Sequence, residues 1–209
     1  SIKRDSPEYV AAQQLTIAEL EVRYTAGDLA TSRLLAQQLR SATAPRNRHM
    51  GLNFGAALDN AAGKLRSAAA AEAERVAFQG TRGVRQVPLW EIIQDVRFRG
   101  QPAVGAAKLD KLVASPAWVA IPPLGRPYLA AADLYAEAGQ PEKARRMLAL
   151  AREAVPEFFA TPNGAMALKE RDVGILLAER KPAEALARAR ETAVAPDGAP
   201  AACQACVAF

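Results

Sequence analysis

Apolar residues recur along the chain at three- and four-residue steps, and glycine-containing breaks separate the stretches that carry them. The clearest unit runs from residue 128 to residue 156, with a break at Gly139 and a stop at Pro156. Side chains at these steps share one helical face, so the pattern predicts two helices joined by a tight turn. The two stripes consist of Tyr128, Ala131, Ala132 and Tyr135, and of Ala144, Leu148 and Ala151.

The same arrangement recurs through the chain. Gly100-Gln101-Pro102 repeats the tripeptide that begins at Gly139, and similar apolar stripes flank it. Five predicted turns are separated by 36, 37, 39 and 41 residues, a regularity that indicates repeated helical hairpins. The predicted hairpin turns lie near Gly27, Gly63, Gly100, Gly139 and Arg180.

The unit at residues 128–156 resembles the tetratricopeptide repeat (TPR), whose pattern is W-x2-L-G-x2-Y, then A-x3-F, then P. The spacing agrees along the whole unit, while Tyr128, Ala131 and Leu148 stand where the pattern has Trp, Leu and Phe. The resemblance implies an all-α protein, an α-solenoid of about five TPR-like hairpins wound into a right-handed superhelix.

Composition agrees with a helical chain, because Ala supplies 48 of the 209 residues while Val, Ile and Thr together supply 26. We expect residues 1–209 to form a single repeat domain, with a partial sixth repeat from about Cys203. The chain begins at Ser1 and ends in an apolar stretch without a helix cap. We therefore expect a fragment of a longer protein, with self-association through the uncapped end as one possible partner interaction.

The TPR resemblance also implies a binding site. In that family the first helices of successive repeats line a concave groove that binds extended peptides or partner helices. We therefore expect a protein interaction or scaffold module with a protein or peptide partner. Trp90 is of most interest because Trp is a frequent interface anchor, although packing between hairpins would explain it equally well. The candidate groove residues are Glu21, Tyr24, Asn53, Asn60, Trp90, Gln94, Arg97, Leu129, Asp133, Glu137 and Glu170.

The net charge of +5 leaves a second hypothesis open. Basic and acidic residues are interleaved over most of the chain, which argues against a nucleic-acid partner and for an ordinary solvated surface. The centre is the exception, because acidic residues are sparse there. The alternative is thus a regulatory sensor domain that binds a small molecule or nucleic acid through the basic centre. Its residues are Arg82, Arg85, Arg97, Arg99 and Lys108.

At a looser level, two features resemble the repeat regions of bacterial signalling proteins such as serine/threonine kinases. They are the sequence segment from Tyr128 to Gly139 and the C-x-x-C motif formed by Cys203 and Cys206. The resemblance implies a signalling role, and the catalytic domain that such proteins carry is not in this chain.

Catalytic and metal-binding signatures are missing from the sequence. His49 is the single histidine and lies close to arginines, a pattern that predicts a solvated loop residue. Cys203 and Cys206 lack the further ligands that a zinc site requires. No phosphate loop or nucleophile elbow occurs. We therefore expect no enzyme activity, cofactor or metal.

No apolar stretch approaches the ~18 residues that span a bilayer. The unpaired cysteine motif slightly favours a location in the cytoplasm.

Overall fold

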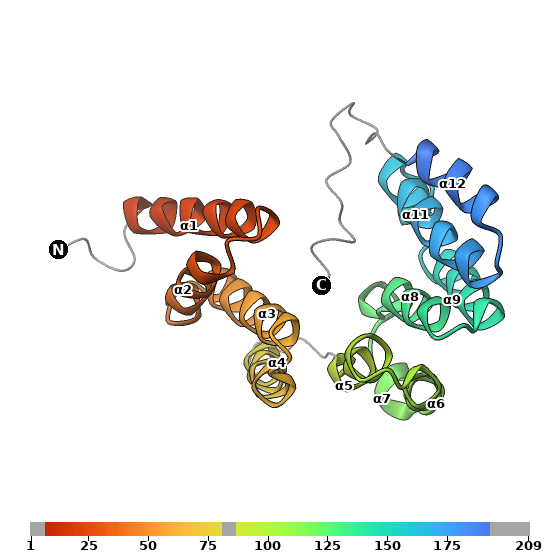
Figure 1. Cartoon of the computed structure of the whole chain (residues 1–209), viewed down its shortest axis with the longest axis horizontal. Helices are drawn as coiled ribbons and strands as arrows, with labels where there is room; N and C mark the ends of the chain where they lie inside the picture. The colour runs from red at the N-terminus through yellow and green to blue at the C-terminus, as the bar shows by residue number, and fades with distance from the viewer. Residues whose placement is uncertain (1–6, 81–86, 193–209) are drawn as a thin grey trace. The chain divides into compact units, whose positions relative to one another are not determined.

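The computed structural model describes residues 7–80 and 87–192, and these fall into two compact units (Figure 1). Unit 1 is the part up to residue 80, and unit 2 is the part from residue 87. Every regular element in the described residues is helical, so the prediction of an all-α protein is confirmed. The interpretation of residues 1–209 as one repeat domain stays a prediction, since each unit is described by itself.

Unit 1 contains two helical hairpins, and each of its helices packs against the next. Its core joins the first three helices through Leu20, Leu39, Phe54 and Leu58, all of which are buried. The Asp28 side chain caps α2 by accepting a hydrogen bond from the Thr31 amide at 3.1 Å. The helices are α1 (Pro7–Thr25), α2 (Leu29–Arg40), α3 (Pro45–Ala61) and α4 (Leu65–Gly80).

Unit 2 contains three hairpins separated by short helical connections. The first helix of its first hairpin, α5, continues directly into a π-helical turn, η1. Each element after η1 except α8 begins with a proline, at a position where the missing amide proton costs nothing. The elements are α5 (Trp90–Ile93), η1 (Gln94–Phe98), α6 (Pro102–Val113), α7 (Pro116–Val119), η2 (Pro123–Gly125), α8 (Tyr128–Glu137), α9 (Pro141–Ala154), α10 (Pro156–Phe159), α11 (Pro162–Ala178) and α12 (Pro182–Glu191).

The core of unit 2 is built around α8, which packs against α9 and α11. Ala131, Ala132 and Ala144 are fully buried there, and Ala151 nearly so. Small side chains let paired helices approach closely, which accounts for part of the alanine excess. Trp118 is buried at the start of the connection to α8 and meets Tyr128 edge-on, with ring centroids 5.7 Å apart.

The five residues with positive φ in the described parts are the positions at which the sequence predicts hairpin turns. Their φ values are 78°, 70°, 63°, 70° and 61° at Gly27, Gly63, Gly100, Gly139 and Arg180. At four of these turns, the next amide donates to the carbonyl five residues earlier, as from Gln140 to Tyr135 at 2.8 Å. At Gly100 the bond spans six residues, from Gln101 to Asp95, because η1 contains one extra residue.

Arg180 is the one non-glycine residue among these five, and its backbone is therefore strained. Replacing Arg180 with glycine is expected to stabilise unit 2 by about 0.5 to 1 kcal/mol, because glycine adopts positive φ without a steric cost. Urea denaturation followed by circular dichroism would measure the change. The matched control is Gly139→Ala, which introduces the same strain at the preceding turn and is expected to destabilise the chain. A loss of stability in Arg180→Gly would contradict this account.

Candidate functional site

The structure places the candidate groove residues in both units. Unit 1 holds Glu21 and Tyr24 on α1, and Asn53 and Asn60 on α3. Glu21 is exposed, and the other three are half-buried. Tyr24 meets Phe54 edge-on with ring centroids 5.5 Å apart, so much of its surface packs within unit 1. These four residues form no charged cluster in the structure.

Unit 2 brings four of the candidates together in a single group of charges. Arg97 lies on η1, Asp133 and Glu137 lie on α8, and Glu170 lies on α11 beside Arg171. The three elements are the first helices of the three hairpins in this unit. We call these five residues the charged cluster.

Arg97 and Glu137 form its best-defined ion pair. The Arg97 guanidinium donates from Nε to Glu137 Oε2 at 2.6 Å and from Nη2 to Oε1 at 2.8 Å. This fork-to-fork geometry is the strong form of an arginine–carboxylate pair. The pair ties η1 to α8, because the two side chains come from elements 40 residues apart in the chain.

Asp133 lies one turn earlier on the same face of α8 and is poorly compensated. Its nearest cation is Arg171, whose Nε lies 3.6 Å from Asp133 Oδ2. Arg171 instead donates from Nη1 to Glu170 at 2.7 Å. Burial, with help from the nearby Glu137 and Glu170 carboxylates, raises the pKa of Asp133 to about 6, although Arg171 and Arg97 oppose the shift.

The fold explains why these groups meet. Asp133 and Glu137 are four residues apart on α8 and so share one helical face. The buried Ala131 and Ala132 beside them leave room for close approach of α11, which carries Glu170 and Arg171. The result is a patch with alternating charge in which the Asp133 carboxylate has its nearest cation, Arg171, at 3.6 Å and receives no hydrogen bond from it.

The remaining unit 2 candidates lie elsewhere. Trp90 and Leu129 are half-buried. Gln94 is only 1% exposed, and its side-chain oxygen accepts a hydrogen bond from Arg99 at 2.8 Å. Gln94 therefore does not face a ligand, because the π turn places it where an apolar core residue would stand.

Arg171 is the residue of the cluster that sequence reasoning missed. It follows a candidate position, Glu170, directly in the sequence. The available signal was charge balance, since three of the candidate positions that meet here are acidic and carboxylates grouped this closely need a cation nearby.

The basic centre is neutralised wherever the structure describes it. Arg97 pairs with Glu137, and Arg99 lies 2.7 Å from Asp95. Lys108 pairs with the other Asp95 oxygen at 2.7 Å. Asp95 is almost fully buried, and these two cations hold its pKa below the usual value against the effect of burial. Arg82 and Arg85 lie outside the described residues.

The residues considered for chemistry are placed as follows. The His49 Nδ1 atom lies 2.7 Å from the Gln79 side-chain nitrogen, in a half-buried position within unit 1. Within residues 7–80 and 87–192, no three His, Cys, Asp or Glu side chains are grouped as a metal site would need. None of the helices described is long and apolar enough to cross a membrane. Cys203 and Cys206, and with them the expected sixth repeat and uncapped end, lie outside the described parts.

Comparison of the chain with protein-family models, with curated proteins and with solved structures finds no match. The fold and the site therefore define it as an all-helical protein with a mixed-charge cluster across three hairpins.

Proposed function

We propose that this chain is a helical-repeat interaction module, similar to TPR proteins, that binds another protein through the charged cluster of unit 2. The hairpins would be the repeats of an α-solenoid wound as a right-handed superhelix, and their first helices would present the binding surface. The occupant would be an extended peptide or a partner helix. The proposed role is binding, without catalysis.

The observation that carries the proposal is the convergence of charged side chains from η1, α8 and α11. A continuous surface built from successive first helices suits a ligand that runs across them. Alternating charges fix the register and orientation of such a ligand more than they add affinity. The under-compensated Asp133 would be the specificity element, since a lysine or arginine of the partner would supply the counter-ion that Arg171 supplies only at 3.6 Å.

Peptide selection tests the proposal directly. Purified protein would be screened against a random peptide library, and the selected peptides would be measured by fluorescence polarisation. We expect basic residues among the selected sequences. Asp133→Asn is expected to weaken binding about 10-fold, as the loss of one charge-assisted contact would. The matched control is Glu142→Gln, an exposed carboxylate on α9 that lies outside the cluster and should leave affinity unchanged.

Two results would contradict the proposal. One is that Asp133→Asn and Glu142→Gln bind the selected peptides as well as the original chain does. The other is preferential binding of oligonucleotides with a steep salt dependence, which would favour the basic-centre alternative.

A further inference from the structure

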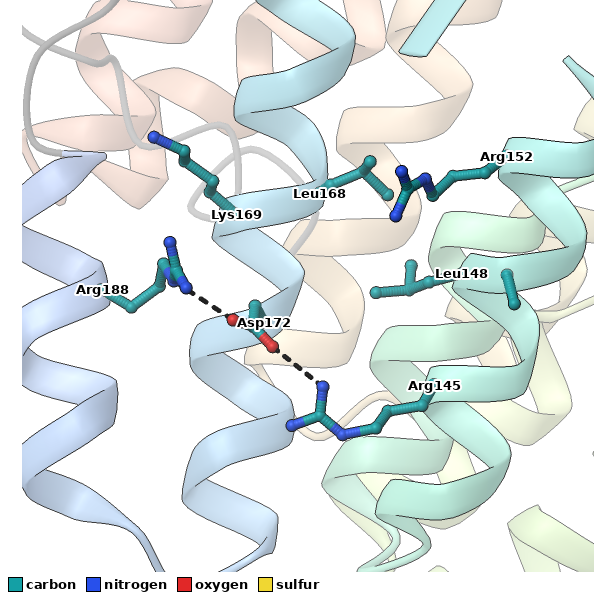
Figure 2. Close-up of a pocket in the computed structure, with 8 residues that line it drawn as sticks. Arg145, Leu148, Arg152, Leu168, Lys169, Asp172 and Arg188 are labelled. Carbon is teal, nitrogen blue, oxygen red and sulfur yellow. Dashed lines mark hydrogen bonds and ion pairs between the residues drawn. The ribbon is translucent and has the colours of Figure 1, made fainter. Parts of the chain in front are cut away.

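A second concave site lies between α9, α11 and α12, within unit 2 and apart from the charged cluster (Figure 2). Its cavity measures about 350 Å³, within the range of small-molecule sites. The wall combines a basic side, contributed by all three helices, with an apolar side formed by Leu148, Ala149 and Leu168.

The charge of the lining is strongly unbalanced. Four cations face a single carboxylate, that of Asp172. Asp172 lies between two of them, with its oxygens 3.2 Å from Arg145 Nη1 and 3.1 Å from Arg188 Nε (Figure 2). Two of the four cations in the lining are therefore already paired with the carboxylate of the cavity itself.

Three of the four cations are also neutralised from outside the cavity. Arg145 donates to Glu179 at 2.6 Å, and Glu191 pairs with both Arg188 and Lys169, at 2.9 and 3.5 Å.

Arg152 differs from the other three. It makes no hydrogen bond or ion pair with any residue in the described ranges. Its guanidinium extends toward Leu168 in Figure 2, and Leu148 lines the same cavity. It is therefore a cation without a counter-ion at the edge of an apolar wall.

We propose that this cavity binds a small amphipathic organic anion, with its carboxylate or phosphate on Arg152 and its hydrocarbon part against Leu148, Ala149 and Leu168. Guanidinium groups bind both headgroups through paired N–H donors. The apolar wall would supply hydrophobic contact to the rest of the ligand, as in most small-molecule sites. This ligand is distinct from the protein partner proposed for the charged cluster.

The test uses three eight-carbon probes and inorganic phosphate. Octanoate, octyl phosphate and octanol would be titrated into ¹⁵N-labelled protein, with amide shifts followed on α9, α11 and α12. We expect saturable shifts there for octanoate or octyl phosphate, and the ratio of the two affinities identifies the preferred headgroup. Octanol and inorganic phosphate, which each lack one half of the proposed ligand, should bind at least 10-fold more weakly.

Two variants should move the anion affinity in opposite directions. Arg152→Gln is expected to weaken binding about 10-fold. Asp172→Asn removes the one carboxylate of the lining, which repels a bound anion, and is expected to strengthen binding about threefold, while Arg145 and Arg188 keep Glu179 and Glu191 as partners. Opposite effects cannot arise from a general loss of folding. The control is Arg146→Gln, an exposed arginine on α9 that lines a different cavity.

Four outcomes would overturn the inference. They are the absence of saturable shifts with either anion, equal binding of octanol, equal binding of inorganic phosphate, and an Arg152→Gln variant that binds octanoate and octyl phosphate as the original chain does.

Discussion

Replacing Gly51 with alanine is expected to destabilise unit 1 by about 2 to 3 kcal/mol. Gly51 lies on α3 where the helix crosses α2, and a Cβ atom there would sit 2.6 Å from the carbonyl carbon of Leu39 and 2.7 Å from the carbonyl oxygen of Ala36. It would also meet the backbone nitrogen of Arg40. These are backbone atoms of a helix, so they cannot rotate away as a side chain would, and the two helices must separate.

Gly55 is the matched control, because it lies one turn later on the same helix with open space around its Cα. Gly55→Ala is expected to stabilise unit 1 by up to about 1 kcal/mol through helix propensity. Urea denaturation monitored by circular dichroism would compare the two variants. A Gly51→Ala variant as stable as Gly55→Ala would show that α2 and α3 are not packed as described.

The second large effect is expected at Asp133, where Asp133→Asn should raise stability at pH 7 by about 2 kcal/mol. A carboxyl that ionises near pH 6 in the folded chain and near 3.8 in the unfolded chain opposes folding at neutral pH. The side chain is 31% exposed, and solvent screening keeps the effect below the full value of the pKa difference. Asparagine keeps the shape of the side chain and removes the partly buried charge.

The effect of Asp133 on stability is expected to depend on pH in a definite direction. Between pH 3.8 and 6 the folded chain binds the Asp133 proton while the unfolded chain has released it, so stability falls as pH rises through this window. Thermal unfolding at pH 4, 5, 6 and 7 should show this decline in the original chain and a flatter profile in Asp133→Asn. An unchanged slope in the variant would assign the decline to other groups.

Asp110→Asn is the control with the opposite sign. Hydrogen bonds from Lys143 and Tyr135 hold the pKa of Asp110 below its usual value, so its ionised form stabilises the folded chain. Its contribution is present above pH 3.8 and is lost as pH falls further, and Asp110→Asn should lower stability at pH 7. The two variants are expected to differ in both measurements. Asp133→Asn should stabilise the chain and weaken peptide binding, whereas Asp110→Asn should destabilise the chain and leave peptide binding unchanged.

Much of the fold could be predicted because its signals are local. A glycine that adopts positive φ, a proline in the first helical turn and apolar residues at helical steps each act within a few residues, as at Gly139 and Pro141. The meeting of Arg97, Asp133, Glu137 and Glu170 depended on a longer inference, that first helices of successive hairpins align. That inference came from the TPR resemblance, in which the first helices of successive repeats line one groove.

The rest depended on information that sequence spacing does not contain. The role of Arg171 follows from the packing of α11 against α8, and the cavity around Arg152 is formed where side chains of α9, α11 and α12 meet. Burial of Gln94 was missed because a π turn changes which residues face inward without changing the residue types. Each of these depends on three-dimensional packing between elements.

The π turn also has a consequence for the alignment of the hairpins with one another. The carbonyl of Asp95 accepts the turn hydrogen bond that the carbonyl of Tyr135 accepts in the next hairpin, so the first helix before it runs one residue out of step. Aligned without a gap, the two hairpins pair Val96 with Tyr135, whereas the structure pairs Asp95 with it. The inserted residue thus brings a carboxylate into an apolar position, and Arg99 and Lys108 neutralise it there. The inserted residue, the Asp95 carboxylate and the two cations are therefore expected to depend on one another, because removing either cation leaves a buried charge less well neutralised.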